Sequence, residues 1–139
     1  MFWDSSTLVP LLLAEPRSVD LTALLGGDKE PTLWWATPLE CQSAIQRRHR
    51  ESPLPHPVIT LATERLRALV ELFDTIAPTD DVRRRAGRLV GVHPLRAADA
   101  LQLAAALIWC EEQPHGERFI CLDARLCDAA RAEGFDVSP

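Results

Sequence analysis

The chain has 139 residues, the usual size of a single domain, and its 47% hydrophobic and 25% charged residues are typical of a globular protein. Its formal charge of −5, from 15 basic and 20 acidic side chains, argues against a nucleic-acid binder when taken alone. No basic stretch followed by an apolar run opens the sequence, and the apolar segment 97–110 is too short to span a bilayer. We therefore expect a cytoplasmic protein without a membrane segment.

The cysteines form no C-x-x-C pair and have no nearby C-x-x-H companion, which argues against a zinc site and against a disulfide framework. We expect them to be small buried hydrophobic residues, with a chance exposed thiol among them, as free cysteines usually are. The four are Cys41, Cys110, Cys121 and Cys127.

Short apolar runs alternate with amphipathic segments in the first half of the chain. Phe2-Trp3 predicts a buried strand that ends at Asp4, and Ser5 or Ser6 is expected to cap the helix that follows. The next expected elements are a helix over 18–25 ended by glycines, a strand over 33–36, a helix from Thr37-Pro38 to Arg50, a proline-rich loop over 52–57 and a helix over 59–72.

The second half continues this alternation. The expected elements are a strand over 75–77, an arginine-rich helix from Thr79 or Asp80 to Val90 stopped by Gly91, a helix over 95–111, a strand over 119–122, a helix over 124–132 and a strand over 135–137. Strands and helices in this order predict one α/β domain, 1–139, with a central parallel sheet covered on both faces.

Four acidic side chains follow the predicted strands or lie beside the predicted sheet. Asp4 and Asp123 come directly after strands, Glu40 lies four residues after the second strand, and Asp99 lies in the helix over 95–111. Ligands of an open parallel sheet bind just past the carboxyl ends of its strands. We therefore expect these four carboxylates to meet at one edge of the sheet.

Asp99 is the most informative of the four acids. It interrupts an almost wholly apolar helix together with Arg96 and Gln102, at spacing i, i+3 and i+6, so these three side chains share one side of the helix. An aspartate at this position lowers helix propensity and costs several kcal/mol if it is buried without a partner. Asp99 therefore requires a cation, a hydrogen-bond donor or water.

The other three acids also have structural interpretations. Thr37-Pro38-Leu39-Glu40 matches a capping box, in which Glu40 bonds back to the start of its own helix. Asp4 and Asp123 are each suited to be the N-cap of the helix that follows. Both kinds of interpretation stay open at the level of sequence.

A magnesium ion accounts for the four acids together. Magnesium is a hard ion that prefers oxygen ligands and keeps several waters, and a divalent cation relieves repulsion among crowded carboxylates. In phosphodiester cleavage, metal ions activate the attacking water and stabilise the leaving oxygen. Two bound divalent ions would change the formal charge from −5 to −1, so net charge does not exclude a nucleic-acid substrate.

Four segments carry a family resemblance that extends over nearly the whole chain. They are 2–6 with the following Leu8-Val9, then 37–40, 95–106 and 119–123. In this order and at these separations they resemble the PIN-domain family, and within it the VapC-type toxins of bacterial toxin–antitoxin pairs. The segment around Asp99 is the most characteristic of the four.

The resemblance implies a three-layer α/β/α fold with a central parallel sheet. It also implies a magnesium- or manganese-dependent endoribonuclease, with Ser6 supporting the first of four catalytic and metal-binding acids, Asp4, Glu40, Asp99 and Asp123. Two positions depart from the family pattern. Cys121 stands where the family often has threonine or serine, and Arg125 stands where a further acid often follows Asp123.

Basic side chains in two clusters, and one beside Asp99, are candidates for contacts with RNA phosphates. The candidates are Arg47, Arg48, Arg84 and Arg96. Solvated helix faces, or favourable charge at a helix C-terminus, explain such clusters equally well. The first two helices are also rich in leucine, and a surplus of leucine on the surface would suit a homodimer or an antitoxin groove, the partners that the resemblance implies.

Two other functions are compatible with parts of the pattern. Asp4 after a strand could be the nucleophile of an aspartyl-phosphate enzyme, but Ser6 occupies the position where one such family needs a second aspartate. The stronger alternative is a PIN-like fold that is not catalytic and serves as an RNA- or protein-binding module.

Overall fold

The computed structural model describes residues 1–138, and Pro139, the last residue of the predicted domain, lies outside them. Five strands form one sheet in the order β3-β2-β1-β4-β5, and every neighbouring pair is parallel. The strands are β1 (Phe2–Trp3), β2 (Thr32–Trp34), β3 (Asp74–Ile76), β4 (Arg118–Ile120) and β5 (Asp136–Ser138). Because all strands run in one direction, the residues that follow β1 and β4 emerge at the same edge of the sheet.

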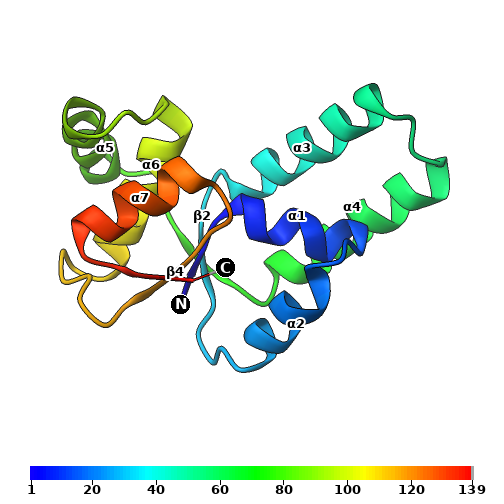
Figure 1. Ribbon diagram of the computed structural model, residues 1–139, viewed down its shortest axis with the longest axis horizontal. Helices are drawn as coiled ribbons and strands as arrows, with labels where there is room; N and C mark the ends of the chain where they lie inside the picture. Colours follow the sequence, from blue (N-terminus) through cyan, green and yellow to red (C-terminus); the bar gives the residue numbers. More distant parts are fainter. Residues whose placement is uncertain (139) are drawn as a thin grey trace.

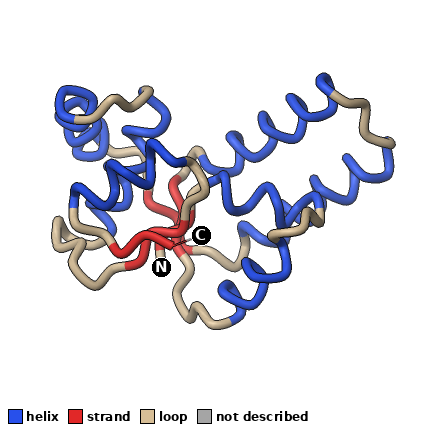
Figure 2. The backbone as a smooth tube through the Cα atoms, in the orientation of Figure 1, coloured by secondary structure: helices blue, strands red, loops and turns tan. Residues whose placement is uncertain are grey.

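Within residues 1–138, seven helices cover the two faces of this sheet (Figures 1 and 2). One face carries α1 (Ser5–Leu13), α2 (Ser18–Gly26), α3 (Thr37–Glu51) and α4 (His56–Val70). The other face carries α5 (Asp80–Val92), α6 (Ala97–Trp109) and α7 (Ala124–Glu133). The predicted three-layer α/β/α architecture with a parallel sheet is confirmed, and Figure 1 shows α3 and α4 extending together away from the sheet.

The central strand β1 turns its two side chains to opposite faces of the sheet and is buried on both, which is why it reads as a continuous apolar run. Phe2 packs in the core beneath α5, α6 and α7, whereas its neighbour Trp3 packs in the core beneath α1 to α4. Phe2 stacks on Phe119 of β4 with 5.7 Å between ring centroids, and Trp3 meets Phe73 edge-on at 6.2 Å. The two cores hold the short central strand from both sides, and thus fix the residue that follows it.

Some predicted boundaries are wrong, each for a local reason. The α1 cap is Asp4 rather than Ser5 or Ser6. Helix α5 does not stop at Gly91: it runs to Val92, and His93 is extended as expected for a residue before a proline. The predicted proline-rich loop ends early, because Pro57 lies in the first turn of α4, where proline is tolerated.

The leucines of the first two helices all contribute to the core on their face of the sheet. Leu8, Leu12 and Leu21 are buried, and the others, Leu11, Leu13, Leu24 and Leu25, are partly buried and pack against them. The surface surplus considered for a docking groove is therefore not found on these helices. The cysteine prediction is confirmed for three of the four, since Cys41, Cys121 and Cys127 are buried and Cys110 is half-buried.

No helix within residues 1–138 combines the length and the apolar character that crossing a bilayer requires.

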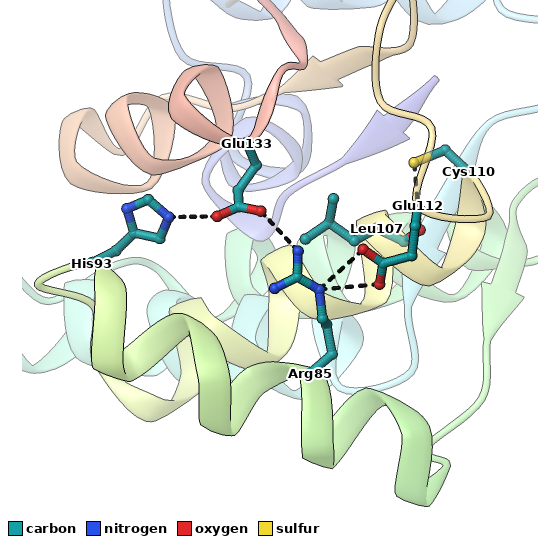
Figure 3. A network of polar contacts seen from close by, with 6 residues as sticks. All are labelled: Arg85, His93, Leu107, Cys110, Glu112 and Glu133. Atoms are coloured by element: carbon teal, nitrogen blue, oxygen red, sulfur yellow. Dashed lines mark hydrogen bonds and ion pairs between the residues drawn. The ribbon is translucent and has the colours of Figure 1, made fainter.

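A network of ion pairs ties α5 to α7 and to the segment after α6 (Figure 3). Arg85 Nη2 donates to Glu133 Oε2 at 2.8 Å, and Arg85 Nε donates to Glu112 Oε1 at 3.0 Å. His93 Nε2 lies 2.7 Å from Glu133 Oε1. Burial acts to raise the pKa of Glu133, but the hydrogen bonds from His93 and Arg85 outweigh it, and the pKa is lowered.

Glu133→Gln is expected to lower the free energy of unfolding at pH 7 by about 1–2 kcal/mol, because charged hydrogen bonds are lost. A folded-state pKa below the ordinary 4.5 means that this stabilisation is present above pH 4.5 and is lost as pH falls through the lowered value. Thermal melts of both proteins at pH 7 and pH 3 measure it. The expected difference in Tm is about 4–8 °C at pH 7 and smaller at pH 3.

Asp128→Asn is the matched control, since it is the same acid-to-amide change on the same helix. Asp128 pairs with Arg131 at 3.2 Å, but its side chain is 80% exposed, so the change is expected to cost well under about 1 kcal/mol. If both variants melt together with the wild type at pH 7, the ion-pair network does not stabilise the fold.

Candidate functional site

A cavity of about 430 Å³ opens at the carboxyl edge of the sheet. All four predicted acids line it: Asp4, Glu40, Asp99 and Asp123. They come from the residue after β1, from the first turns of α3 and α6, and from the segment between β4 and α7. The structure thus brings together four carboxylates that are far apart in the sequence.

Asp4 is almost completely buried, with 4% of its surface exposed. Its Oδ2 accepts a hydrogen bond from the backbone N–H of Ser6 at 2.9 Å, so the interpretation of Asp4 as the N-cap of α1 holds. Burial raises the pKa of the carboxyl even though several hydrogen bonds act to lower it. The cap engages one carboxylate oxygen, so capping and cation binding do not exclude each other.

The capping-box interpretation of Glu40 is wrong. The N-cap of α3 is Ala36, and the hydroxyl of Thr37 makes no bond to the helix N-terminus. Thr37 Oγ1 donates instead to Gln102 Oε1 at 3.3 Å. The Glu40 side chain is half-buried and lines the cavity.

The charges of Asp4 and Asp99 act on Glu40 across the cavity. Burial raises the pKa of Glu40, and the negative charges of Asp4 and Asp99 raise it further, whereas a hydrogen bond with Ser5 acts to lower it. Carboxylates that perturb one another in this way are close enough to repel. A cation among them would relieve that repulsion.

Asp123 lies three residues after the end of β4, rather than directly after the strand as predicted. Its Oδ1 accepts from the backbone N–H of Leu126 at 3.0 Å, which makes it the N-cap of α7. The structural interpretation of Asp123 therefore holds, and its side chain also lines the cavity.

A buried thiol lies between the first and last of these acids. Cys121 Sγ is 3.6 Å from Asp4 Oδ2 and accepts from the backbone N–H of Asp123 at 3.3 Å. Burial raises the pKa of this thiol, which keeps it neutral. Ser6 Oγ accepts from the N–H of Leu122 at 2.9 Å, so Ser6 ties the start of α1 to the segment that carries the thiol.

Arginine side chains line the same cavity as the acids. They are Arg47, Arg48, Arg96 and Arg125. Arg125 is named from the sequence only as a departure from the family pattern and not as a residue of the site. Its position two residues after Asp123 is the signal that could have placed it in the cavity. Arg84, also predicted as an RNA contact, lies elsewhere: it is exposed on α5, where it pairs with Asp81.

Gln102 is, after Arg125, a second residue whose role in this site the sequence does not predict. It lines the cavity but is only 1% exposed, one turn beyond Asp99 on α6. The spacing of Arg96, Asp99 and Gln102 predicted a shared side, and all three line the cavity. Spacing alone contained no signal for the partners of the buried amide.

The residues of the cavity suit a hard divalent cation in their chemistry. Their charged donors are carboxylates, which magnesium and manganese prefer, and no histidine or cysteine is among the described residues that line it. Within residues 1–138, no three His, Cys, Asp or Glu side chains form a ready-made metal cluster. Magnesium does not require one, because it commonly binds through one or two carboxylates and keeps several waters.

No protein-family model matches the chain, and no curated protein matches it. Among solved structures, its fold is similar to that of a chain from a toxin–antitoxin complex of Klebsiella pneumoniae, with a TM-score of 0.63. The two chains are 18% identical, and the similarity covers 89% of this chain and 87% of the other. At this identity the likeness shows that the two chains share a fold.

Proposed function

We propose that this protein is a magnesium- or manganese-dependent endoribonuclease of the PIN-domain family, and the VapC-type toxin of a toxin–antitoxin pair. The observation that carries the proposal is one cavity in which four carboxylates and four guanidinium groups lie together. The resemblance of segment 95–106 to the PIN-domain family supports it. The similarity of fold to a chain of a toxin–antitoxin complex supports the toxin role.

In this proposal the carboxylate oxygens of the four acids would hold the cation, with Ser6 and Cys121 supporting the positions of Asp4 and Asp123. When bound, the ion supplies a water of lowered pKa and neutralises charge on the phosphate. Burial makes the metal-free carboxylates of Asp4 and Glu40 less stable as anions, and the charges of Asp4 and Asp99 add to this effect at Glu40, which favours uptake of a cation.

The arginines of the cavity would bind the phosphates of the RNA. Arg96 and Arg125 lie closest in sequence to Asp99 and Asp123, and they suit the scissile phosphate through paired N–H donors. Arg47 lies seven residues along α3 from Glu40, about 10 Å of helix. That separation suits a neighbouring phosphate of the same strand, as cleavage within a chain requires.

The same proposal includes a cognate antitoxin protein as partner, a homodimer as the assembly and the cytoplasm as the place of action. Such partners could cover apolar side chains that are exposed elsewhere than on the first two, leucine-rich helices. Trp35, just before α3, and Leu39, in its first turn, are 59% and 66% exposed.

Cleavage of a circular RNA tests the proposed activity, since only an endonuclease opens a circle. Purified protein is expected to linearise it in millimolar Mg²⁺ or Mn²⁺, to be inactive in EDTA, and to recover when excess Mg²⁺ is added. Gel electrophoresis separates the circle from the linear product. Opening of the circle in EDTA would rule out a metal-dependent mechanism.

A non-catalytic RNA-binding module is the alternative, and the lack of a ready-made trio of metal ligands within residues 1–138 favours it. This alternative predicts that RNA is retained on a filter by the protein but is never cut, whichever divalent ion is present. The same circular RNA distinguishes the two functions, because retention and opening are measured separately.

A further inference from the structure

We propose that Gln102 is a positioning residue that holds three of the four acid-bearing segments in register, an inference that rests on the proposed function. Its side chain is 1% exposed, and its amide makes two hydrogen bonds. Gln102 Oε1 accepts from Thr37 Oγ1 at 3.3 Å, and Gln102 Nε2 donates to the carbonyl of Trp3 at 3.2 Å. One buried amide therefore joins α6, the start of α3 and the end of β1.

Each end of this bridge lies beside an acid of the cavity. Trp3 directly precedes Asp4 in the chain. Thr37 lies three residues before Glu40, in the same first turn of α3. Gln102 itself lies one turn after Asp99 and lines the cavity with it. A shift of any of these three segments would move one carboxylate relative to the other two.

The hydrogen-bond pattern fixes how the amide is oriented. If its oxygen and nitrogen were exchanged, Oε1 would face the Trp3 carbonyl, and two acceptors would meet. Thr37 is fully buried as well, so neither group has water as an alternative partner. The three groups satisfy one another only when α3, α6 and β1 keep their present positions.

Stability alone does not call for glutamine at this position. An apolar residue of similar size would fill the same space, and a buried hydrogen-bonded pair is often replaced almost neutrally when both of its partners become apolar. What the amide adds is a directional constraint at the base of the acids, which repel one another and so cannot hold the segments together themselves. Residues that support metal ligands in this way commonly change metal affinity or activity by about 10–100-fold.

Gln102→Leu, made in the full chain, tests this inference by three measurements. Titration with Mn²⁺ followed by electron paramagnetic resonance is expected to give a Kd at least about tenfold higher than in the wild type. The kcat for RNA cleavage is expected to fall at least about tenfold while KM stays within about twofold. The Tm is expected to fall by about 4–12 °C and no more, because the Thr37 hydroxyl and the Trp3 carbonyl lose a partner at a cost of about 1–3 kcal/mol.

Two further variants make the result specific. Thr37→Val removes one of the two hydrogen bonds and retains Gln102, so it is expected to weaken Mn²⁺ binding in the same direction by a smaller factor. Gln113→Leu makes the same chemical change on an exposed residue beyond α6, and it is expected to leave Kd, kcat and Tm unchanged.

The outcomes separate this inference from the proposed function. If the wild type binds Mn²⁺ and cuts RNA but Gln102→Leu does both equally well, the positioning role is overturned and the nuclease stands. If Gln102→Leu loses Mn²⁺ affinity only with a fall in Tm well beyond about 12 °C, and Thr37→Val retains full affinity, Gln102 is merely structural and the inference is also overturned. If the wild type neither binds Mn²⁺ nor cuts RNA, the proposed function fails first, and the inference with it.

Discussion

Asp99→Asn is expected to lower the rate of magnesium-dependent RNA cleavage on the order of a thousandfold while the chain stays folded. A cation that stabilises developing charge contributes several kcal/mol to catalysis, and each 1.36 kcal/mol corresponds to a tenfold change in rate. Asp99 suits this test better than Asp4 or Asp123, because those two also cap helices. The N-cap of the Asp99 helix is Arg96, so the amide removes the charge without removing a cap.

Asp128→Asn provides the matched control for Asp99→Asn, since Asp128 is an exposed helical aspartate outside the cavity. Its cleavage rate is expected to equal that of the wild type. Single-turnover rates with saturating RNA, measured across a range of Mg²⁺ concentrations, show whether the loss reflects weaker metal binding or slower chemistry. Asp99→Asn with the wild-type rate at every Mg²⁺ concentration would remove Asp99 from the proposed mechanism.

The order of elements and the gathering of the acids could be predicted because both depend on local patterns. Two local patterns each predict a strand and the acidic residue that follows it. They are Phe2-Trp3 followed by Asp4, and Phe119-Ile120 followed closely by Asp123. In a parallel sheet all such residues emerge at one edge, so two local patterns are sufficient to predict a shared site.

The helix caps and the interior of the site could not be predicted in the same way. Whether a helix is capped by Asp4 or by a neighbouring serine depends on the angle at which the chain leaves β1, and that angle is set by packing on both faces of the sheet. The partners of Gln102 lie 65 and 99 residues away in the sequence. No pattern in the helix over 95–111 specifies contacts at such separations.

Which arginines lie in the cavity also could not be predicted from the sequence alone. By sequence the two clusters are equally suited to contact RNA, but three arginines of α5, Arg83, Arg84 and Arg85, pair with acids in the folded chain. Arg84 pairs with Asp81 on its own helix, whereas Arg85 reaches Glu133, 48 residues away. Arg47 instead lines the cavity, because α3 begins at the site and Arg47 lies farther along the same helix.

In EDTA at pH 7, Asp4→Asn is expected to melt at a higher temperature than the wild type, although it abolishes cleavage. Burial raises the pKa of Asp4, so the ionised carboxylate destabilises the folded state, and asparagine keeps the size and the N-cap without the charge. In a chain of this length, each 1 kcal/mol gained raises Tm by about 4 °C. The charge of Asp4 thus lowers the stability of the metal-free fold, as expected for a residue kept for the proposed function.

The pH dependence of this difference in Tm distinguishes a charge effect from a packing effect. A carboxyl whose folded-state pKa lies above its unfolded value of about 3.8 becomes protonated in the folded state first, so the wild type is stabilised as pH falls through the raised pKa towards 3.8. The advantage of Asp4→Asn is therefore expected to shrink between pH 7 and pH 4. Millimolar Mg²⁺ at pH 7 is expected to shrink it as well, by stabilising the wild type alone. If Asp4→Asn melts below the wild type in EDTA, or if its advantage is unchanged by both acid and Mg²⁺, the charge of the buried carboxylate does not destabilise the metal-free fold.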